Sequence, residues 1–516
     1  MHHRGWDNCS AACTALVTML PYSSTVHVRI VFVNESEKVP GTDRGPVDVP
    51  VRLLLPVIVS AVFIIVMNGS MVNVALPTIG EEFGVSEGQA GWVISGYLLV
   101  FAVGIPLYGR LADVYSLRKA FSVGLVGFAA GSLVCALAPN LPVLVAGRVL
   151  QAAGGAAIPA LSSTSVAKLL SPGQRGGALG LIVSSVGVGG AVGPVVGGVV
   201  VQLAGWHTLF YGTFFLGLIL LSASLRVLPD AFSDKSDSSF DLPGGVLLAL
   251  AAGLFLFGVT EGQVKGFYSA LSWGSFVTAT LAAAAFARRI TTTPEPFVSP
   301  RLLRNGAYLT CAAVGFLGML ANLTSIIFVP LLLADVNGLG PGAAGLTLAP
   351  GAVAVALLSP LAGRFSDRVG SRPLILAGLA TMTLSLLALS AFGVGASALF
   401  VAAGMLGVGV GFAGITSPNT NATAATLPRD EVGVGLGIYQ MLFFLGGGCG
   451  PALLGAFLAA RRESGAGALN PFYTLNATAF SDAFLLLSLC SLVALLVVSY
   501  GRSTADKGPG ASGFRL

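Results

Sequence analysis

Two short stretches decide the fold: residues 109–119 read GRLADVYSLRK, and residues 363–372 read GRFSDRVGSR. Each stretch opens with Gly-Arg and places an aspartate, Asp113 or Asp367, one helical turn later, followed by further arginines. Each also follows a long apolar run. A motif that recurs after matching runs predicts that the chain contains two related halves.

Two further echoes support the repeat. Residues 189–194 and 446–451 share the pattern Gly-x-x-x-Gly-Pro, and residues 146–148 (Ala-Gly-Arg) correspond to residues 403–405 (Ala-Gly-Met). Fourteen unrelated segments would not reproduce three motifs in register. Alternating-access transporters are built from such repeats and bind their substrate between the halves, near the middle of the membrane.

Composition places the chain in a lipid bilayer. Of its 516 residues 54% are apolar and only 9% are charged, whereas a soluble domain carries about 25% charged residues. Apolar runs long enough to cross about 30 Å of hydrocarbon recur along the chain. We therefore expect an all-α integral membrane fold with fourteen spans, near residues 53–76, 90–109, 120–138, 142–163, 177–202, 208–227, 243–261, 268–287, 308–333, 344–363, 373–392, 395–417, 433–458 and 481–501.

The spans group as six, two and six. We expect a disordered cytoplasmic tail (1–50), a six-helix bundle (51–230), two extra spans (231–290), a second bundle (291–502) and a cytoplasmic tail (503–516). Lysine and arginine gather in alternate loops, and the loops between them carry only Lys265, Arg461 and Arg462. Since positive loops stay inside, both termini are predicted to be cytoplasmic, in a plasma-membrane protein.

Residues 109–119 resemble the loop motif GxLaDrxGrk of the major facilitator superfamily, with Ser116 in place of its usual glycine. The resemblance implies two six-helix bundles and a conformational switch at their inner face. In one conformation Asp113 pairs with a group across that face, and its counterpart in the repeat does the same. The alternative is a solvated loop whose charges only set topology. The predicted switch residues are Asp113, Arg110, Arg118, Asp367 and Arg368.

Residues 189–198 resemble the antiporter motif GxxxGPxxGG, which is associated with export in that superfamily. Glycine lets helices approach closely, and proline removes a backbone hydrogen bond so that a helix can bend. Generic helix packing is the alternative, because glycine is abundant throughout. The motif residues are Gly189, Gly193, Pro194, Gly197 and Gly198.

Arg148 lies within an apolar run and matches the arginine of the family pattern RxxqGxgaA, with Gln151 in place. A charge inside a span is costly and normally faces the bundle interior or a watery path. Arg148, Gln151 and Asn68 are therefore predicted to form part of the proton or substrate path. The alternative is an arginine near the membrane edge whose side chain reaches outward.

Asn68 stands where many fourteen-helix drug:proton antiporters carry an acid, and in this respect the chain resembles the Gram-positive-type tetracycline exporters. Those exporters carry a glutamate in their glycine-rich thirteenth span, whereas residues 444–450 here contain no acid. The carboxylates near the membrane stand at span ends: Asp113, Asp367, Glu261, Asp335 and Asp482.

Several polar residues within the spans are predicted to line a wide, apolar substrate cavity, although each could instead bond one helix to another. Such a cavity suits an amphipathic or aromatic compound better than a sugar, peptide or phosphate. The predicted cavity residues are Asn73, Tyr97, Asn322, Asn419, Asn421, Tyr439 and Gln440.

These features predict a secondary transporter that exports a hydrophobic or amphipathic drug-like compound, with tetracycline as one candidate, by proton antiport and alternating access. The alternatives are a facilitator for an endogenous metabolite with a different coupling ion, and a scaffold kept for binding or sensing. The chain lacks a GxxxxGK[ST] phosphate loop and clustered His or acidic residues, so an ATP-driven pump and an enzyme are not expected. We expect a monomer without metal, cofactor or nucleic-acid partner.

Overall fold

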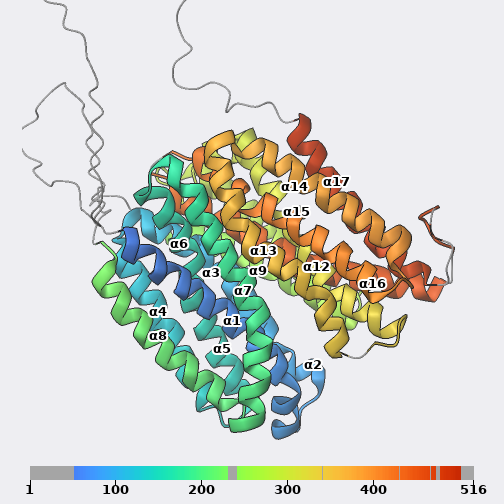
Figure 1. The fold of residues 1–516 in the computed structure, drawn as a ribbon. Helices are drawn as coiled ribbons and strands as arrows, with labels where there is room; N and C mark the ends of the chain where they lie inside the picture. Colours follow the sequence, from blue (N-terminus) through green and yellow to red (C-terminus); the bar gives the residue numbers. More distant parts are fainter. Residues whose placement is uncertain are drawn as a thin grey trace, which may run out of the picture. The chain divides into compact units, whose positions relative to one another are not determined.

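A computed structural model describes residues 51–229, 241–339, 341–428, 430–464, 467–471, 473 and 477–500. The predicted tails, 1–50 and 503–516, lie outside these residues. The described chain is helical and contains no strand, and fourteen of its helical segments are long and apolar enough to span a membrane (Figure 1). The predicted all-α fold with fourteen spans is therefore confirmed.

The helices fall into three consecutive groups. The first group comprises α1 (Val51–Phe83), α2 (Glu87–Ala90), α3 (Trp92–Val114), α4 (Leu117–Ala136), α5 (Leu141–Gly155), α6 (Ala157–Leu169), α7 (Pro172–Ala204) and α8 (His207–Val227). The second is the pair α9 (Leu242–Lys265) and α10 (Ala270–Thr292). The third comprises α11 (Pro300–Arg304), α12 (Gly306–Asp335), α13 (Pro341–Val369), α14 (Ser371–Ala388), the π-helical turn η1 (Leu389–Gly393), α15 (Ala398–Ala425), α16 (Val432–Ser464) and α17 (Thr478–Tyr500).

Several helices run beyond the apolar stretches that predicted them. The first span was predicted to end at residue 76, but α1 continues to Phe83. It ends where Gly84 adopts a φ of 62° and the Val85 amide donates to the Gly80 carbonyl at 3.0 Å. This glycine-terminated arrangement satisfies the last carbonyls of a helix. Apolar composition therefore located the spans, whereas turn chemistry set their ends.

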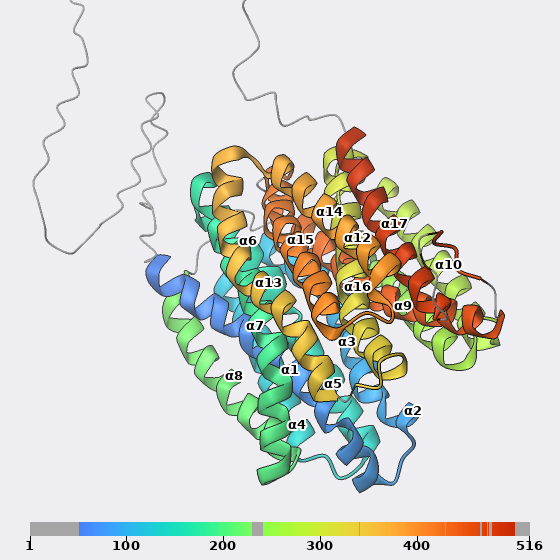
Figure 2. The ribbon, with the colours of Figure 1, turned by 45° about the vertical axis from the view of Figure 1, so that its right-hand side comes forward.

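The first and third groups form two halves that meet along two helix pairs, α7 with α13 (Figure 1) and α3 with α16 (Figure 2). Glycine brings these helices together: a side chain at Gly180 of α7 would collide with the Ser359 carbonyl of α13. On the other pair, Gly437 of α16 lies against Pro106 of α3. In lipid, helices associate through such close packing rather than through the hydrophobic effect.

The two extra helices form a hairpin at the edge of the bundle (Figure 2). Helix α9 contacts α3 of the first half and α16 of the second half. Asp241 ties the hairpin together: it caps α9 through the Gly244 amide, pairs with Arg289 at 2.7 Å and accepts from the Phe297 amide at 3.0 Å. Burial raises the pKa of Asp241, but these hydrogen bonds outweigh it and hold the pKa below its usual value.

Candidate transport pathway

The repeated aspartates lie at the same end of the two halves, here called the motif end. Asp113, at the end of α3, accepts hydrogen bonds from the backbone amides of Gly433 at 3.0 Å and Val434 at 2.8 Å. These amides belong to the first turn of α16, where helical N–H groups have no partner within the helix. The carboxylate also complements the positive end of the helix dipole. Asp113 of the first half therefore caps a helix of the second half.

Asp367 makes the reciprocal contact. At the end of α13, it accepts from the amides of Gly176 at 2.9 Å and Gly177 at 3.2 Å, near the beginning of α7. An aspartate of the second half thus holds a helix of the first half. We call these two contacts the Asp113 clamp and the Asp367 clamp.

The clamps differ in the partner that each aspartate finds in its own half. Lys168 of α6 pairs with Asp113 at 2.7 Å, and the side chains of these two residues are 13% and 2% exposed. Asp367 instead accepts from the amide group of Asn421 on α15 at 3.2 Å. The Asp113 clamp is therefore an ion pair, and the Asp367 clamp is a charged group held by neutral donors.

Glycine makes both clamps possible. A side chain at Gly433 would collide with the Gly109 carbonyl and with the Asp113 carboxylate. A side chain at Gly176 would collide in the same way with the Gly363 carbonyl and with Asp367. The halves thus touch backbone to backbone at the motif end, which is closed in this structure.

The arginines predicted to belong to the switch have other roles or positions. Arg118 donates to the Leu228 carbonyl at 2.7 Å, at the end of α8, and its counterpart Arg372 donates to the Ser499 carbonyl at 3.1 Å, at the end of α17. Both therefore fasten the last helix of their own half. Arg110 is half-buried, and Arg368 is exposed.

Arg148 lies in the interior of the first half and is 1% exposed. Its Nη1 donates to Asn68 Oδ1 at 2.9 Å and to Gln151 Oε1 at 2.5 Å, and its Nε donates to the Val93 carbonyl at 3.2 Å. The guanidinium carbon stands 3.9 Å from the ring centroid of Tyr97. The structure thus brings Arg148, Gln151 and Asn68 together, and the side chain does not reach outward to the membrane edge.

No carboxylate pairs with Arg148 within the described part of the chain. The network continues from Gln151 to Ser132, whose hydroxyl accepts at 2.7 Å. Ser132 was not predicted, because a single serine in an apolar run does not distinguish a network residue from any other. Arg148 is therefore a buried cation held by neutral groups and by one aromatic ring.

A row of aromatic side chains extends from this cation to the second half. Tyr97 stacks on Phe101 with ring centroids 5.5 Å apart, and Phe101 meets Phe444 of α16 edge-on at 5.3 Å. Phe444 then contacts Phe443, which leads to Tyr439. We call these five residues the aromatic row. Phe443 and Phe444 stay half-buried although both pack against core clusters.

The remaining predicted cavity residues divide into several kinds. Asn419 donates to the Cys311 carbonyl at 2.8 Å and to the Tyr439 hydroxyl at 3.2 Å, so it bonds neighbouring helices. Gln440 crosses between the halves and donates to Ser163 Oγ at 2.6 Å. Asn322 is buried on α12, and Asn73 is exposed on α1.

The glycines of the predicted antiporter motif face α1. A side chain at Gly189 would meet the Phe63 carbonyl, at Gly193 it would meet Ser70, and at Gly197 it would meet Met71. Pro194 lies within α7, on an exposed part of its surface, and Gly198 has more room. The motif therefore joins α7, which also lines the contact between halves, to α1.

The three acids predicted at the opposite end of the helices have basic partners. Glu261 pairs with Lys265 at 2.8 Å, and Asp335 pairs with Arg462 at 2.5 Å. Asp482 is buried and pairs with Arg461. Within the described ranges, no group of His, Cys, Asp and Glu could hold a metal ion.

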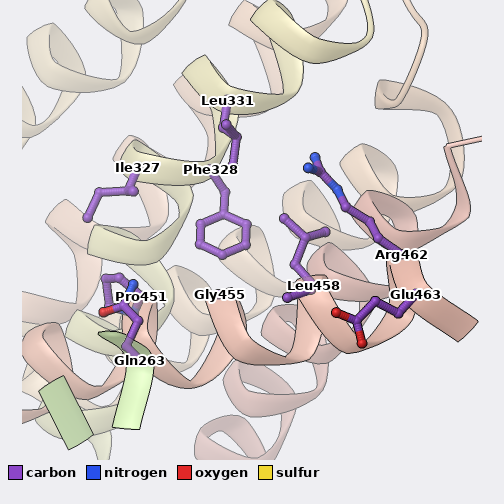
Figure 3. Close-up of a pocket in the computed structure, with 10 residues that line it drawn as sticks. Gln263, Ile327, Phe328, Leu331, Pro451, Gly455, Leu458, Arg462 and Glu463 are labelled. Carbon is purple, nitrogen blue, oxygen red and sulfur yellow. The ribbon is translucent and has the colours of Figure 1, made fainter. Parts of the chain in front are cut away.

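A pocket of about 500 Å³ lies apart from these residues, between α9, α12 and α16 (Figure 3). Phe328, Leu331 and Leu458 form its apolar wall, with Arg462 and Glu463 beside it. None of the predicted site residues lines it. It is therefore a peripheral pocket at the edge of the second half.

Two related halves, reciprocal clamps and a buried cation near their contact define a membrane transporter with two-fold internal repetition. The sequence profile of the Major Facilitator Superfamily matches residues 58–451 and 310–512. The chain therefore belongs to the major facilitator superfamily and is a transporter rather than an enzyme.

Relatives with known names agree with this assignment. The multidrug resistance protein Stp of Mycobacterium tuberculosis is 31% identical over 399 residues, which cover 77% of this chain and 74% of that protein. The riboflavin transporter RibZ of Clostridioides difficile is 26% identical over 407 residues, covering 79% and 88%. The crystal structure of the human organic anion transporter MFSD10 superposes with a TM-score of 0.64 at 15% identity, covering 87% of this chain and 99% of that one. This last likeness concerns the fold alone.

Proposed function

We propose that the chain exports an amphipathic, drug-like compound across the plasma membrane by proton antiport, and that it works as a monomer. The observation that carries this proposal is the pair of reciprocal clamps, in which an aspartate of each half accepts hydrogen bonds from the backbone of a helix in the other half. Such contacts form or break together when two rigid halves rock about a central site. We infer from the positive loops that the motif end faces the cytoplasm, which would make this conformation closed to the cytoplasm.

The proton must act on a group whose surroundings change between conformations. The predicted acids at the opposite end, Glu261, Asp335 and Asp482, already pair with basic residues. In the Asp367 clamp, by contrast, the charge is held by amides that leave when the halves separate. We propose that Asp367 couples the proton to the conformational change.

The nature of the cargo rests on the aromatic row and on the family. Contact with the aromatic row would favour an amphipathic compound, and tetracycline is one candidate. The name of Stp supports a drug as cargo. The name of RibZ supports the alternative, an endogenous metabolite carried by the same fold.

The test is proton release from energised inside-out vesicles that contain the protein, after addition of tetracycline or of compounds from a panel of amphipathic drugs. We expect a signal for the wild type, a signal lost in Arg148→Ala, and an unchanged signal in Arg226→Gln. The control removes an exposed arginine near the end of α8. A correctly inserted protein that moves the panel without proton exchange would refute antiport, and one that moves only metabolites would favour the alternative.

A further inference from the structure

The surroundings of Arg148 carry information about the charge of the cargo. Its guanidinium is fixed by Asn68, Gln151 and the Val93 carbonyl, all of them neutral. A buried ion without a counter-charge is costly, particularly inside a membrane. The site is therefore one charge short in the described part of the protein, and the missing charge is negative.

Hydrogen bonding around Arg148 is incomplete in the same sense. Asn68 is fully buried, and its Oδ1 accepts from Arg148, which leaves its Nδ2 without a partner among the described residues. Arginine has no acceptor atom, so this orientation of the amide is required. The hydroxyl of Tyr97, which is 4% exposed, also lacks a partner there. Within the described residues, the buried atoms without a partner at this site are therefore Asn68 Nδ2 and the Tyr97 hydroxyl.

These two groups are hydrogen-bond donors. Leaving a buried donor unpaired is costly, so two of them beside one buried cation form a site that is incomplete without acceptor atoms. A carboxylate, sulfonate or ionised phenol supplies both the acceptors and the charge. A cationic ligand would add to the charge that is already unbalanced.

The aromatic row begins at the same place, because the ring of Tyr97 lies against the guanidinium and continues to Phe101. Phe101 then reaches Phe444 on the other half. Flat rings prefer offset-stacked or edge-on contacts with aromatic side chains. A ligand whose anionic group meets Arg148 can therefore lay its rings along the row and touch both halves.

We propose that the cargo is a planar aromatic anion, and that its charged group binds Arg148, Asn68 and Tyr97. This inference rests on the proposed function, because it names the substrate class of the same pathway. It also explains how export proceeds without an acid in the middle of the described bundle. A negative-inside membrane potential itself drives an anion outward.

Binding to the purified full-length protein in nanodiscs tests the proposal. The probes are anthraquinone-2-sulfonate and an anthraquinone that carries a trimethylammonium group, measured by equilibrium dialysis. Methanesulfonate and chloride serve as anions without rings and compete for the bound probe. We expect the aromatic anion to bind at least tenfold more tightly than the aromatic cation, and the small ions to compete only weakly.

The decisive variant is Asn68→Asp, which is nearly isosteric and places a carboxylate 2.9 Å from Arg148, where Asn68 Oδ1 stands. This internal counter-charge should weaken binding of the aromatic anion at least tenfold. Gln202→Glu is the matched control, because it adds the same charge at an exposed position on α7. Tyr97→Phe should keep the stack and weaken anion binding severalfold, which tests the site with a second, conservative change.

Several results would overturn the proposal: no binding of the aromatic anion, equal or tighter binding of the cation, or insensitivity to Asn68→Asp. Displacement by chloride at equal concentration would show a small-ion site and overturn the aromatic part. The vesicle assay separates this inference from the proposed function. Export of a cationic or neutral compound would leave export standing without an anion site, whereas anion binding without any transport would leave the site standing without export.

Discussion

The two clamps at the motif end follow one design with different chemistry. In both, an aspartate of one half accepts hydrogen bonds from backbone amides near the start of a helix of the other half, and glycines allow the backbones to meet. Asp113 also pairs with the half-buried Lys168, whereas Asp367 is held by Asn421 and backbone amides. The two halves therefore share the geometry of the contact but not the positively charged partner of the aspartate. The ion pair makes the Asp113 clamp depend on its own half, and the Asp367 clamp depends more on the partner half.

The largest change is expected from Asp113→Asn. It removes the carboxylate with which Lys168 pairs, and breaking a largely buried pair in this way costs about 3–5 kcal/mol. We expect the motif end to open in most molecules. The measurement is the distance distribution between spin labels at Tyr115 and Val369, exposed positions after α3 and at the end of α13, in a protein whose native cysteines are replaced.

The double variant Asp113→Asn/Lys168→Gln provides the control, because it removes the positive charge of Lys168 together with the negative charge of Asp113. It should recover part of the closed population. If the double variant opens as far as the single one, the charge of Lys168 does not cause the opening. The difference in charge between the two clamps would then not explain their different behaviour.

An intermediate change is expected from Gly433→Ala and Gly176→Ala. Each methyl group would collide with a carbonyl and an aspartate of the opposite half, and overpacking of this kind costs about 1–3 kcal/mol. The closed population measured with the same labels should fall in both variants by similar amounts. Gly173→Ala is the matched control on α7, since a side chain there would meet nothing within 4 Å. An equal effect of Gly173→Ala would point to helix propensity rather than to collision.

A smaller change is expected from Asp367→Asn. The Asn side chain keeps one acceptor oxygen for these backbone amides and loses the other, and no ion pair is broken, so the loss is comparable to that of a helix cap, about 0.5–2 kcal/mol. Its effect on proton coupling should exceed its effect on closure. The measurement is the number of protons released per substrate in the vesicle assay, and unchanged stoichiometry would exclude Asp367 as the coupling group.

The smallest effect on closure is expected at Asp241, which lies outside both clamps and ties the α9–α10 hairpin. Its pKa is lowered in the folded protein, so its stabilisation is present above the unfolded pKa of about 4 and is lost as the pH falls through the lower folded value. Wild type should therefore unfold at a higher temperature than Asp241→Asn at pH 7. The gap should shrink at the most acidic pH that the protein tolerates, while the label distance at pH 7 stays the same in both proteins. A gap independent of pH would contradict this role.

The sequence allowed a good part of this organisation to be predicted. The number of spans follows from composition, and Asp113 and Asp367 stand out because their motif occurs twice. The groups that they bind could not be predicted, because the donors at Gly176 and Gly433 are backbone amides that no side-chain pattern reveals. Lys168 was visible only as one more positive charge at a span end.

The interior shows the same limit. Arg148, Gln151 and Asn68 were predicted as one group, because a charge in an apolar helix requires polar company. Asn419 and Tyr439 bond to each other across helices, which the sequence could not distinguish from contact with a substrate. The direction of a polar side chain within a span depends on helix rotation, and apolar composition on every face of the helix leaves that rotation undetermined.

We propose that the two clamps hold the motif end closed while the opposite end is free to open. The most direct test combines two label pairs in wild type and in Asp113→Asn/Asp367→Asn: Tyr115 with Val369 at the motif end, and Leu203 with Leu346, both exposed, near the other end of α7 and the start of α13. Alternating access predicts that the variant lengthens the first distance and shortens the second. Two unchanged distances, or two that lengthen together, would contradict the account.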